Sequence, residues 1–192
     1  MPATPQPRGL IEVLSNVPRS ARWILPTLAA AFGDADVSTL GLRTKALVLL
    51  RVAAVDRAPY WRLQIEAGAR DLGITEDELV LIASDEWEIS PGLSERERAA
   101  ILWGDRVARR LARRDKKAYE TVRAVFSEVE LVELTLLASL GAMADRITNA
   151  LRIAPEPPVG LTPGAAVMPA DLEAWSARMF EADLSDAWKA YR

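Results

Sequence analysis

The sequence predicts an all-α protein, and two observations support this fold class. The first is a set of three capping boxes, in which a Ser or Thr hydroxyl can accept from the third backbone N–H of a helix while a Glu reaches back to the cap. The boxes pair Thr75 with Glu78, Ser94 with Glu97, and Ser127 with Glu130. The second is that no stretch shows the sustained period-two alternation of a half-buried strand. A bundle of helices is therefore expected.

In order, the expected helices are 10–14, 20–32, 44–55, 59–72, 76–83, 95–113, 117–126 and 128–152. Gly33 and Gly73 follow the second and fourth of these, where a helix end favours a left-handed residue. The three capping boxes begin the fifth, sixth and eighth. The eighth is apolar over most of its circumference, which predicts a place in the centre of a domain or at a subunit interface.

The chain divides into three expected parts. Residues 1–39 form an N-terminal extension of helices, 40–153 a helical domain, and 154–192 a proline-rich linker followed by a C-terminal helix. This last helix is rich in aromatic side chains, which must pack on something. Docking onto its own domain and clasping a neighbouring subunit are both open.

Composition narrows the range of partners. The 192 residues carry 24 basic and 27 acidic side chains, a net charge of −3, and the basic run near residues 106–117 has helical spacing typical of a solvated face. Nucleic acid is therefore not expected as a partner. No apolar signal core begins the chain, and no apolar run is long enough to cross a membrane. We expect a cytoplasmic protein that does not bind membranes.

The chain has no cysteine and no histidine. The first absence excludes disulfides and all thiol chemistry, and the second removes the commonest general base at neutral pH and the commonest transition-metal ligand. The acidic residues concentrate at helix starts, where they complement the helix dipole, so no metal site is expected. No glycine-rich phosphate loop follows a strand, and no cofactor is expected.

The segment APYWRLQIEAGARDLG, residues 58–73, resembles the signature helix of the AhpD-like/carboxymuconolactone decarboxylase superfamily. In the redox branch of that family the signature reads Cys-x-Tyr-Cys, three residues, His, three residues, Ala-Arg, and then Gly. The frame is present here as Tyr60, Ala69, Arg70 and Gly73. Further pieces follow in the family's order between residues 40 and 152. The resemblance implies an AhpD-like helical bundle.

The reactive positions of that signature are all apolar in this chain. The two cysteines correspond to Ala58 and Trp61, the histidine to Ile65, and the relay glutamate twelve residues before the first cysteine to Ala46. A peroxidase of this type needs a low-pKa thiolate and a resolving thiol. The histidine-dependent decarboxylase route is closed at Ile65 as well.

Positions 58, 61, 65 and 68 share one helix face, so an apolar surface replaces the reactive site. Ala58, Trp61 and Ile65 are expected either to be core or to line an apolar substrate pocket with Arg51. Arg51 lies on an otherwise apolar helix and must pair with an acid, reach solvent or meet an anionic ligand. Asp56, Asp145 and a neighbouring subunit are the candidates for an acid partner.

Three polar residues of the same helix are weak catalytic candidates. Tyr60 and Gln64 could hydrogen-bond a ligand, although both could equally be interface residues. Glu66 lies four residues from both Arg62 and Arg70, and two nearby cations lower the pKa of a carboxylate, which does not suit a base near neutrality. Arg62, Glu66 and Arg70 more simply form an exposed ion-pair stripe.

Two functions follow as hypotheses. The first is a non-redox enzyme acting on a small carboxylated or cyclic organic substrate, by decarboxylation, lactone rearrangement or cyclisation. The second is a non-catalytic binding or scaffold protein that keeps only the family's helical shell. The resemblance implies a homo-oligomer in both cases: a dimer, trimer or hexamer.

Overall fold

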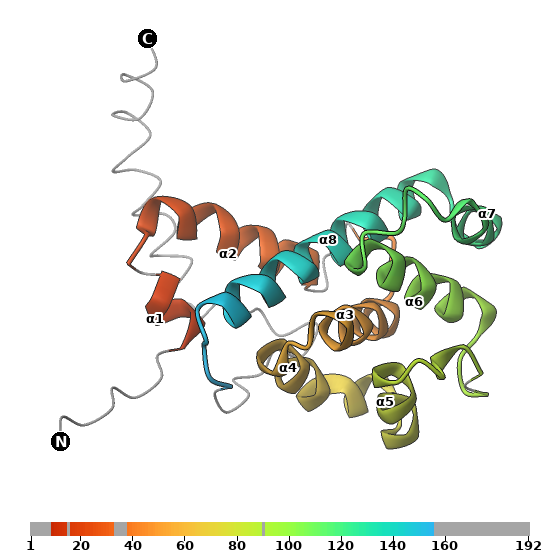
Figure 1. Cartoon of the computed structure of the whole chain (residues 1–192), viewed down its shortest axis with the longest axis horizontal. Coiled ribbons are helices and arrows are strands. Elements are labelled where there is room, and N and C mark those ends of the chain that lie inside the picture. The colour runs from red at the N-terminus through yellow and green to blue at the C-terminus, as the bar shows by residue number, and fades with distance from the viewer. Residues whose placement is uncertain (1–8, 15, 33–37, 90, 156–192) are drawn as a thin grey trace, which may run out of the picture.

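The computed structural model describes residues 9–14, 16–32, 38–89 and 91–155. These residues form helices and contain no β-strand, so the predicted all-α fold is confirmed (Figure 1). The α-helices are α1 (Leu10–Leu14), α2 (Pro18–Phe32), α3 (Leu42–Asp56), α4 (Pro59–Ala69), α5 (Glu76–Ala83), α6 (Glu95–Ala108), α7 (Lys116–Val125) and α8 (Glu128–Ala150). Two 3-10 turns, η1 (Arg70–Leu72) and η2 (Trp87–Ile89), follow α4 and α5. The predicted linker and aromatic helix lie outside the described residues.

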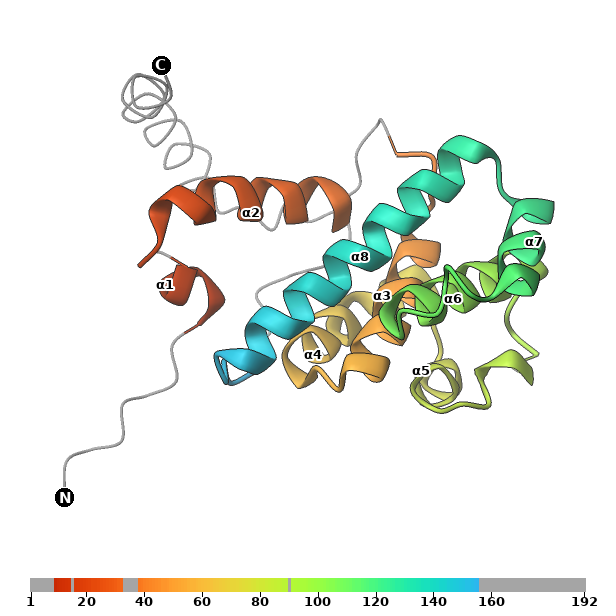
Figure 2. The same cartoon turned by 45° about the horizontal axis from the view of Figure 1, so that its top comes forward.

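Helix α3 is the centre of the bundle. Its residues 45–53 are all buried, and it packs against α4, α5, α6 and α8. Figures 1 and 2 show α8 crossing the bundle with α3 on one side and α2 on the other. Residues 45–53 of α3 have no solvent face, which explains why all of them except Lys45 and Arg51 are apolar.

Two glycines allow α6 and α8 to approach α3 closely. A Cβ on Gly104 of α6 would lie 2.9 Å from Val48 Cγ1, and a Cβ on Gly141 of α8 would lie 2.8 Å from Leu49 Cδ2. Both distances are shorter than a van der Waals contact. The absence of side chains at these two positions therefore sets the spacing of the central three helices.

The three predicted capping boxes are confirmed, and each also links two helices. In every box the N3 glutamate accepts from the N-cap backbone N–H with one carboxylate oxygen. The other oxygen pairs with an arginine of a different helix: Glu78 and Glu97 with Arg43, at 2.6 and 2.7 Å, and Glu130 with Arg96. The same residues thus begin a helix and hold it against a neighbour.

The expected helix 95–113 is wrong at its end, because α6 stops at Ala108. Arg110 adopts the left-handed conformation at φ 61°, its N–H bonds to Val107 O at 3.0 Å, and the N–H of Leu111 bonds to Arg106 O at 2.8 Å. This is a Schellman end with arginine in the position that glycine usually takes. Because no glycine stands at position 110, the sequence does not indicate that the helix ends there.

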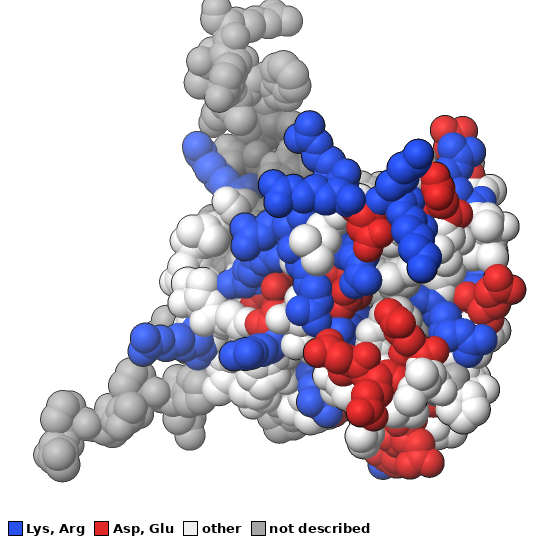
Figure 3. Space-filling view, turned by 45° about the vertical axis from the view of Figure 1, so that its right-hand side comes forward, with Lys and Arg blue, Asp and Glu red and all other residues white. Residues whose placement is uncertain are grey.

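The surface has separate acidic and basic areas. On the face shown in Figure 3, Lys and Arg gather over the upper and middle part, and Asp and Glu gather below them. No helix within the described residues is long and apolar enough to cross a membrane.

Candidate functional site

Helix α4 and its N-cap bring together Ala58, Trp61 and Ile65, the three positions that the sequence resemblance aligns with two cysteines and a histidine. Ala58 is its N-cap, and Ala58, Trp61 and Ile65 are all buried. The Trp61 ring meets two aromatic rings edge-on: Phe32 of α2 at 5.6 Å and Tyr60 at 5.3 Å between centroids. We call Phe32, Tyr60, Trp61 and Ile65 the Trp61 cluster.

The polar group at the centre of this cluster is the indole N–H of Trp61. Only 3% of the residue is exposed, and Nε1 has no hydrogen-bond partner within the described residues. Burying such a donor without an acceptor costs about 1–3 kcal/mol, and native proteins rarely leave one unpaired. Within the described residues, the Trp61 cluster therefore contains an indole N–H that has no acceptor and lies among aromatic rings.

The weak catalytic candidates occupy two different environments. Tyr60, a member of the Trp61 cluster, and Gln64, four residues further along α4, are both buried. Glu66 lies toward solvent, where Arg62 Nε donates to Glu66 Oε1 at 2.5 Å. Arg70 turns instead to Glu76 of α5. Glu66 is thus part of a partly exposed ion pair with one arginine, and the stripe of three does not form.

Arg51 of α3 lies in a buried network of arginine and aspartate side chains. Its guanidinium has five N–H donors, and the structure gives a partner to each nitrogen. Nε donates to Asp105 Oδ1 at 2.8 Å, and Nη1 donates to the backbone oxygens of Ile82 and Ser84 at 3.1 and 2.6 Å. Nη2 lies 2.8 Å from Asp85 Oδ1 and 2.7 Å from Asp105 Oδ1.

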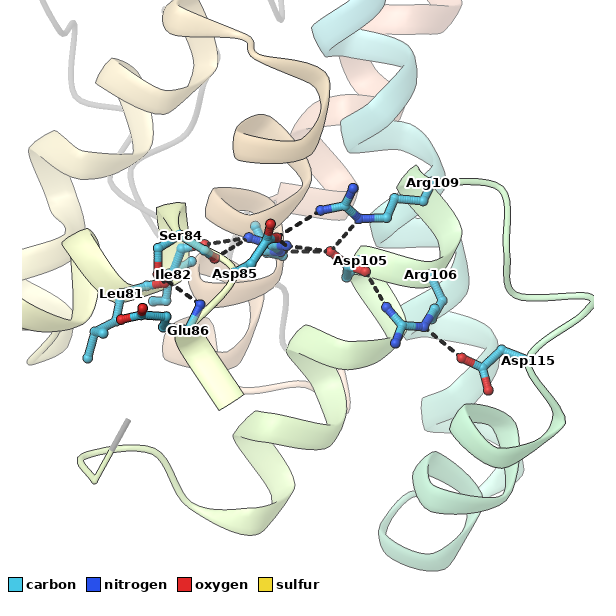
Figure 4. A network of polar contacts seen from close by, with 10 residues as sticks. Leu81, Ile82, Ser84, Asp85, Glu86, Asp105, Arg106, Arg109 and Asp115 are labelled. Atoms are coloured by element: carbon cyan, nitrogen blue, oxygen red, sulfur yellow. Dashed lines mark hydrogen bonds and ion pairs between the residues drawn. The ribbon is translucent and has the colours of Figure 1, made fainter. Parts of the chain in front are cut away.

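Asp105 of α6 is the centre of this network. It is 1% exposed and pairs with Arg51, with Arg106 at 2.5 Å and with Arg109 at 3.0 Å. Figure 4 shows Arg106 and Arg109 directed at Asp105, and Asp115 beyond Arg106. Sequence reasoning named Asp56 and Asp145 as possible partners of Arg51 and missed Asp105. The available signal was a lone aspartate among the apolar residues of α6.

A second buried carboxyl belongs to Asp145, which is not among the partners of Arg51. Asp145 of α8 is 2% exposed. Burial, with a smaller contribution from the charge of Asp56, raises its pKa to about 8. Arg146 pairs with Asp56 at 3.3 Å rather than with Asp145. Asp145 is therefore a carboxylic acid that keeps its proton at neutral pH.

Within the described residues, no three Asp or Glu side chains lie where they could hold a metal ion together.

Comparison with known proteins places the chain in one fold. No protein-family model and no curated protein matches the sequence. Among solved structures, the chain is similar to a protein of unknown function from Agrobacterium tumefaciens that is described as a putative antioxidant defence protein AhpD. The two chains are 23% identical, and their TM-score is 0.68 over 78% of this chain and 99% of the other. A peroxidase-related protein with an AhpD core from Ralstonia eutropha JMP134 is 13% identical, with a TM-score of 0.65 over 82% and 80%.

A third structure, a cysteine-to-alanine variant of the debrominase Bmp8 in complex with 2,3,4-tribromopyrrole, is 18% identical. Its TM-score is 0.63 over 78% of this chain and 77% of that one. These similarities show that the chain has the AhpD-like fold, and the chain contains no cysteine.

Proposed function

We propose that this protein binds a small, neutral, cyclic organic molecule at the Trp61 cluster and carries out no thiol chemistry. The observation behind this proposal is the buried indole N–H of Trp61, which has no acceptor within the described residues. A ring with one hydrogen-bond acceptor would satisfy this donor and pack against the edges of Phe32 and Tyr60.

The Bmp8 complex supports this type of ligand. In that structure a protein of the same fold, with a cysteine replaced by alanine, is in complex with a small aromatic ring. Here alanine stands naturally at position 58, one of the two positions that correspond to the family's cysteines. By this analogy, a ring can be held without a thiol.

The contacts of Arg51 favour a neutral ligand over the carboxylated one expected from the sequence. Its guanidinium already meets two carboxylates and two backbone carbonyls. Removing one partner from a buried ion pair costs about 3–5 kcal/mol. Arg51 would have to lose such a partner before it could bind an anionic ligand.

The second candidate is the non-redox enzyme of the decarboxylation, lactone-rearrangement or cyclisation type, and Asp145 is the observation that favours it. A carboxyl with a pKa of about 8 can donate or accept a proton near neutral pH. Helix α8, which carries Asp145, packs against α4, which carries Trp61. Conversion of a cyclic ligand to product, lost in an Asp145→Asn variant that still binds it, would favour this candidate over simple binding.

Two rings of similar shape test the binding proposal. Quinoline has a ring nitrogen that accepts a hydrogen bond, and naphthalene has none. We expect the protein to bind quinoline about tenfold more tightly, a difference of one hydrogen bond. Titration followed by the NMR signals of the indole N–H groups would measure both affinities and show which tryptophan responds.

Trp61→Phe removes the N–H and keeps an aromatic ring, so this variant should lose the preference for quinoline. Trp103→Phe is the matched control, because Trp103 Nε1 already donates to Thr135 Oγ1 at 2.8 Å. Equal affinity for both rings in the unaltered protein, or an unchanged preference in Trp61→Phe, would refute the proposal. Turnover of hydroperoxide with a dithiol donor, above a cysteine-free control protein, would refute its non-thiol part.

A further inference from the structure

A pocket of about 540 Å³ lies where α6, the loop that follows it and α7 meet. Its lining consists of Trp103 from α6, Ala112 and Arg113 from the loop, and Lys116 and Tyr119 from α7. The rings of Trp103 and Tyr119 lie 5.9 Å apart between centroids, and Tyr119 is 40% exposed. We call this site the α6–α7 pocket. It shares no residue with the Trp61 cluster.

Both charged residues that line the α6–α7 pocket are basic. Arg113 forms no hydrogen bond or ion pair within the described residues. Lys116 pairs with Glu120 at 3.6 Å, but its side chain remains 88% exposed. A third cation lies close by, because the guanidinium of Arg123 is 6.0 Å from the ring centre of Tyr119. The pocket therefore suits an occupant that combines aromatic rings with negative charge.

The part of this chain beyond the described residues has that combination. Residues 170–191, where the sequence predicts the aromatic C-terminal helix, contain five acidic and two basic side chains. Steps of four, four and three positions separate Phe180, Leu184, Trp188 and Tyr191. This spacing predicts that the four side chains share one face of the helix. We call these four residues the aromatic stripe.

The chain is long enough to bring this segment to the α6–α7 pocket of its own domain. Trp103 Nε1 donates to Thr135 Oγ1 of α8 at 2.8 Å, so the pocket adjoins α8 at Thr135. At 1.5 Å per residue, Thr135 lies about 23 Å along α8 from its last residue, Ala150. Residues 156–169 are rich in proline and can span about 43 Å at 3.1 Å per residue. The span exceeds the distance.

We propose that residues 170–191 dock in the α6–α7 pocket of their own domain. The aromatic stripe packs on the rings of Trp103 and Tyr119, and the acidic side chains of the segment face Arg113 and Lys116. A tether of this length holds the segment at an effective concentration of about a millimolar, so contacts that are weak between separate molecules suffice. This inference does not depend on the ligand of the Trp61 cluster.

The test uses the full chain, in which two introduced thiols are the only ones because the sequence has no cysteine. One variant combines Ala112→Cys in the pocket with Ala187→Cys beside Trp188. The control combines Ala187→Cys with Val80→Cys on α5, at a side chain that is 68% exposed and does not line the pocket. A short bismaleimide should join the two thiols of the first variant within one chain about tenfold faster than those of the control.

Mass spectrometry of the intact protein measures the cross-linking and decides between the outcomes. Equal rates in the two variants would overturn the proposal. Covalent dimers in place of cross-links within one chain would show that a second copy supplies the segment, and would overturn docking on the segment's own domain.

Substitutions added to the pocket variant test the two kinds of contact. Trp188→Ala should slow the cross-linking about fivefold, and Trp175→Ala is its control, because Trp175 lies five positions before Phe180 and hence off the stripe. Arg113→Glu should also slow it, whereas Arg114→Glu should not, since Arg114 is exposed and does not line the pocket. Thermal denaturation verifies that each variant is folded. Equal rates within either pair would contradict the proposed contacts.

Discussion

At the scale of single residues, the buried carboxylate of Asp105 forms ion pairs with three arginines. No acidic residue that the sequence singled out as a candidate forms as many. Asp105 balances Arg51, Arg106 and Arg109 while being almost fully buried. The Coulomb energy of such a cluster offsets the cost of removing its charges from water only while every partner is present.

Asp105→Asn should therefore lower the free energy of unfolding by about 3–5 kcal/mol, because Arg51 stays buried with reduced compensation. Asp85→Asn is the control, since Asp85 also pairs with Arg51 but its side chain is 86% exposed. Its loss should cost much less than the loss of Asp105, because solvent screens an exposed ion pair. Urea denaturation measures both, and equal effects would contradict the central role of Asp105.

Asp145 makes stability depend on pH in a direction opposite to most carboxylates. Its pKa is about 8 in the folded protein against an ordinary value of 3.8. Between these pH values the folded state holds a proton that the unfolded state has released, so stability falls as pH rises.

Asp145→Asn removes this dependence. Relative to the unaltered protein, the variant should gain stability as pH rises from about 4 to 8, by at most about 1.4 kcal/mol per pH unit, with no such gain below pH 4. Denaturation at several pH values measures the difference. The exposed control Asp71→Asn should change stability by less than about 0.5 kcal/mol. A difference for Asp145→Asn that stays constant with pH would show that this carboxyl does not titrate as inferred.

At the scale of helices, three ends have a residue other than glycine in the left-handed conformation. Arg57, Arg110 and Arg152 have φ values of 52°, 61° and 53°, while Gly73 ends the α4–η1 segment at 70°. A side chain in this conformation costs roughly 1 kcal/mol or more relative to glycine. The arginines are tolerated because each of these ends keeps its backbone hydrogen bonds.

Arg110→Gly should stabilise the protein by about 1 kcal/mol, because it relieves this strain. Arg109→Gly is the matched control: Arg109 is right-handed at φ −75°, and the change also removes its contact with Asp105. The control should be destabilised. Thermal denaturation of both variants decides the point, and a loss of stability in Arg110→Gly would contradict the strain argument.

At the scale of the whole molecule, the first half of α8 has an apolar surface that α2 and α3 leave exposed. Val129, Val132 and Leu136 lie three and four residues apart, hence on one face, and are 67%, 56% and 57% exposed. The predicted homo-oligomer stays a prediction, and this face is where we expect copies to meet.

Leu136→Asp should therefore reduce the mass measured by light scattering after size-exclusion chromatography, because a charge would be buried at the contact. Val80→Asp on α5, at a side chain that is 68% exposed, should leave the mass unchanged. A monomeric mass for the unaltered protein would contradict the expected assembly.

The fold could be predicted largely from local patterns. The capping boxes placed the starts of α5, α6 and α8 at the right residues, because a cap bonds to a backbone group only three positions away. Helix ends were harder to predict. The end of α6 was missed because an arginine carries no left-handed signal, and α4 passes into η1 before Gly73.

The sequence by itself determined that this protein has helices, where most of them begin, and that no thiol or imidazole can act in it. These properties depend on residue identity and on neighbours within one helical turn. Only the tertiary structure decided that Arg51 pairs with Asp105, 54 positions away. It also decided that Trp61 is buried, with an N–H that has no acceptor within the described residues. Such pairings depend on which helices meet α3 and on their spacing, which the small residues Gly104 and Gly141 set by close packing.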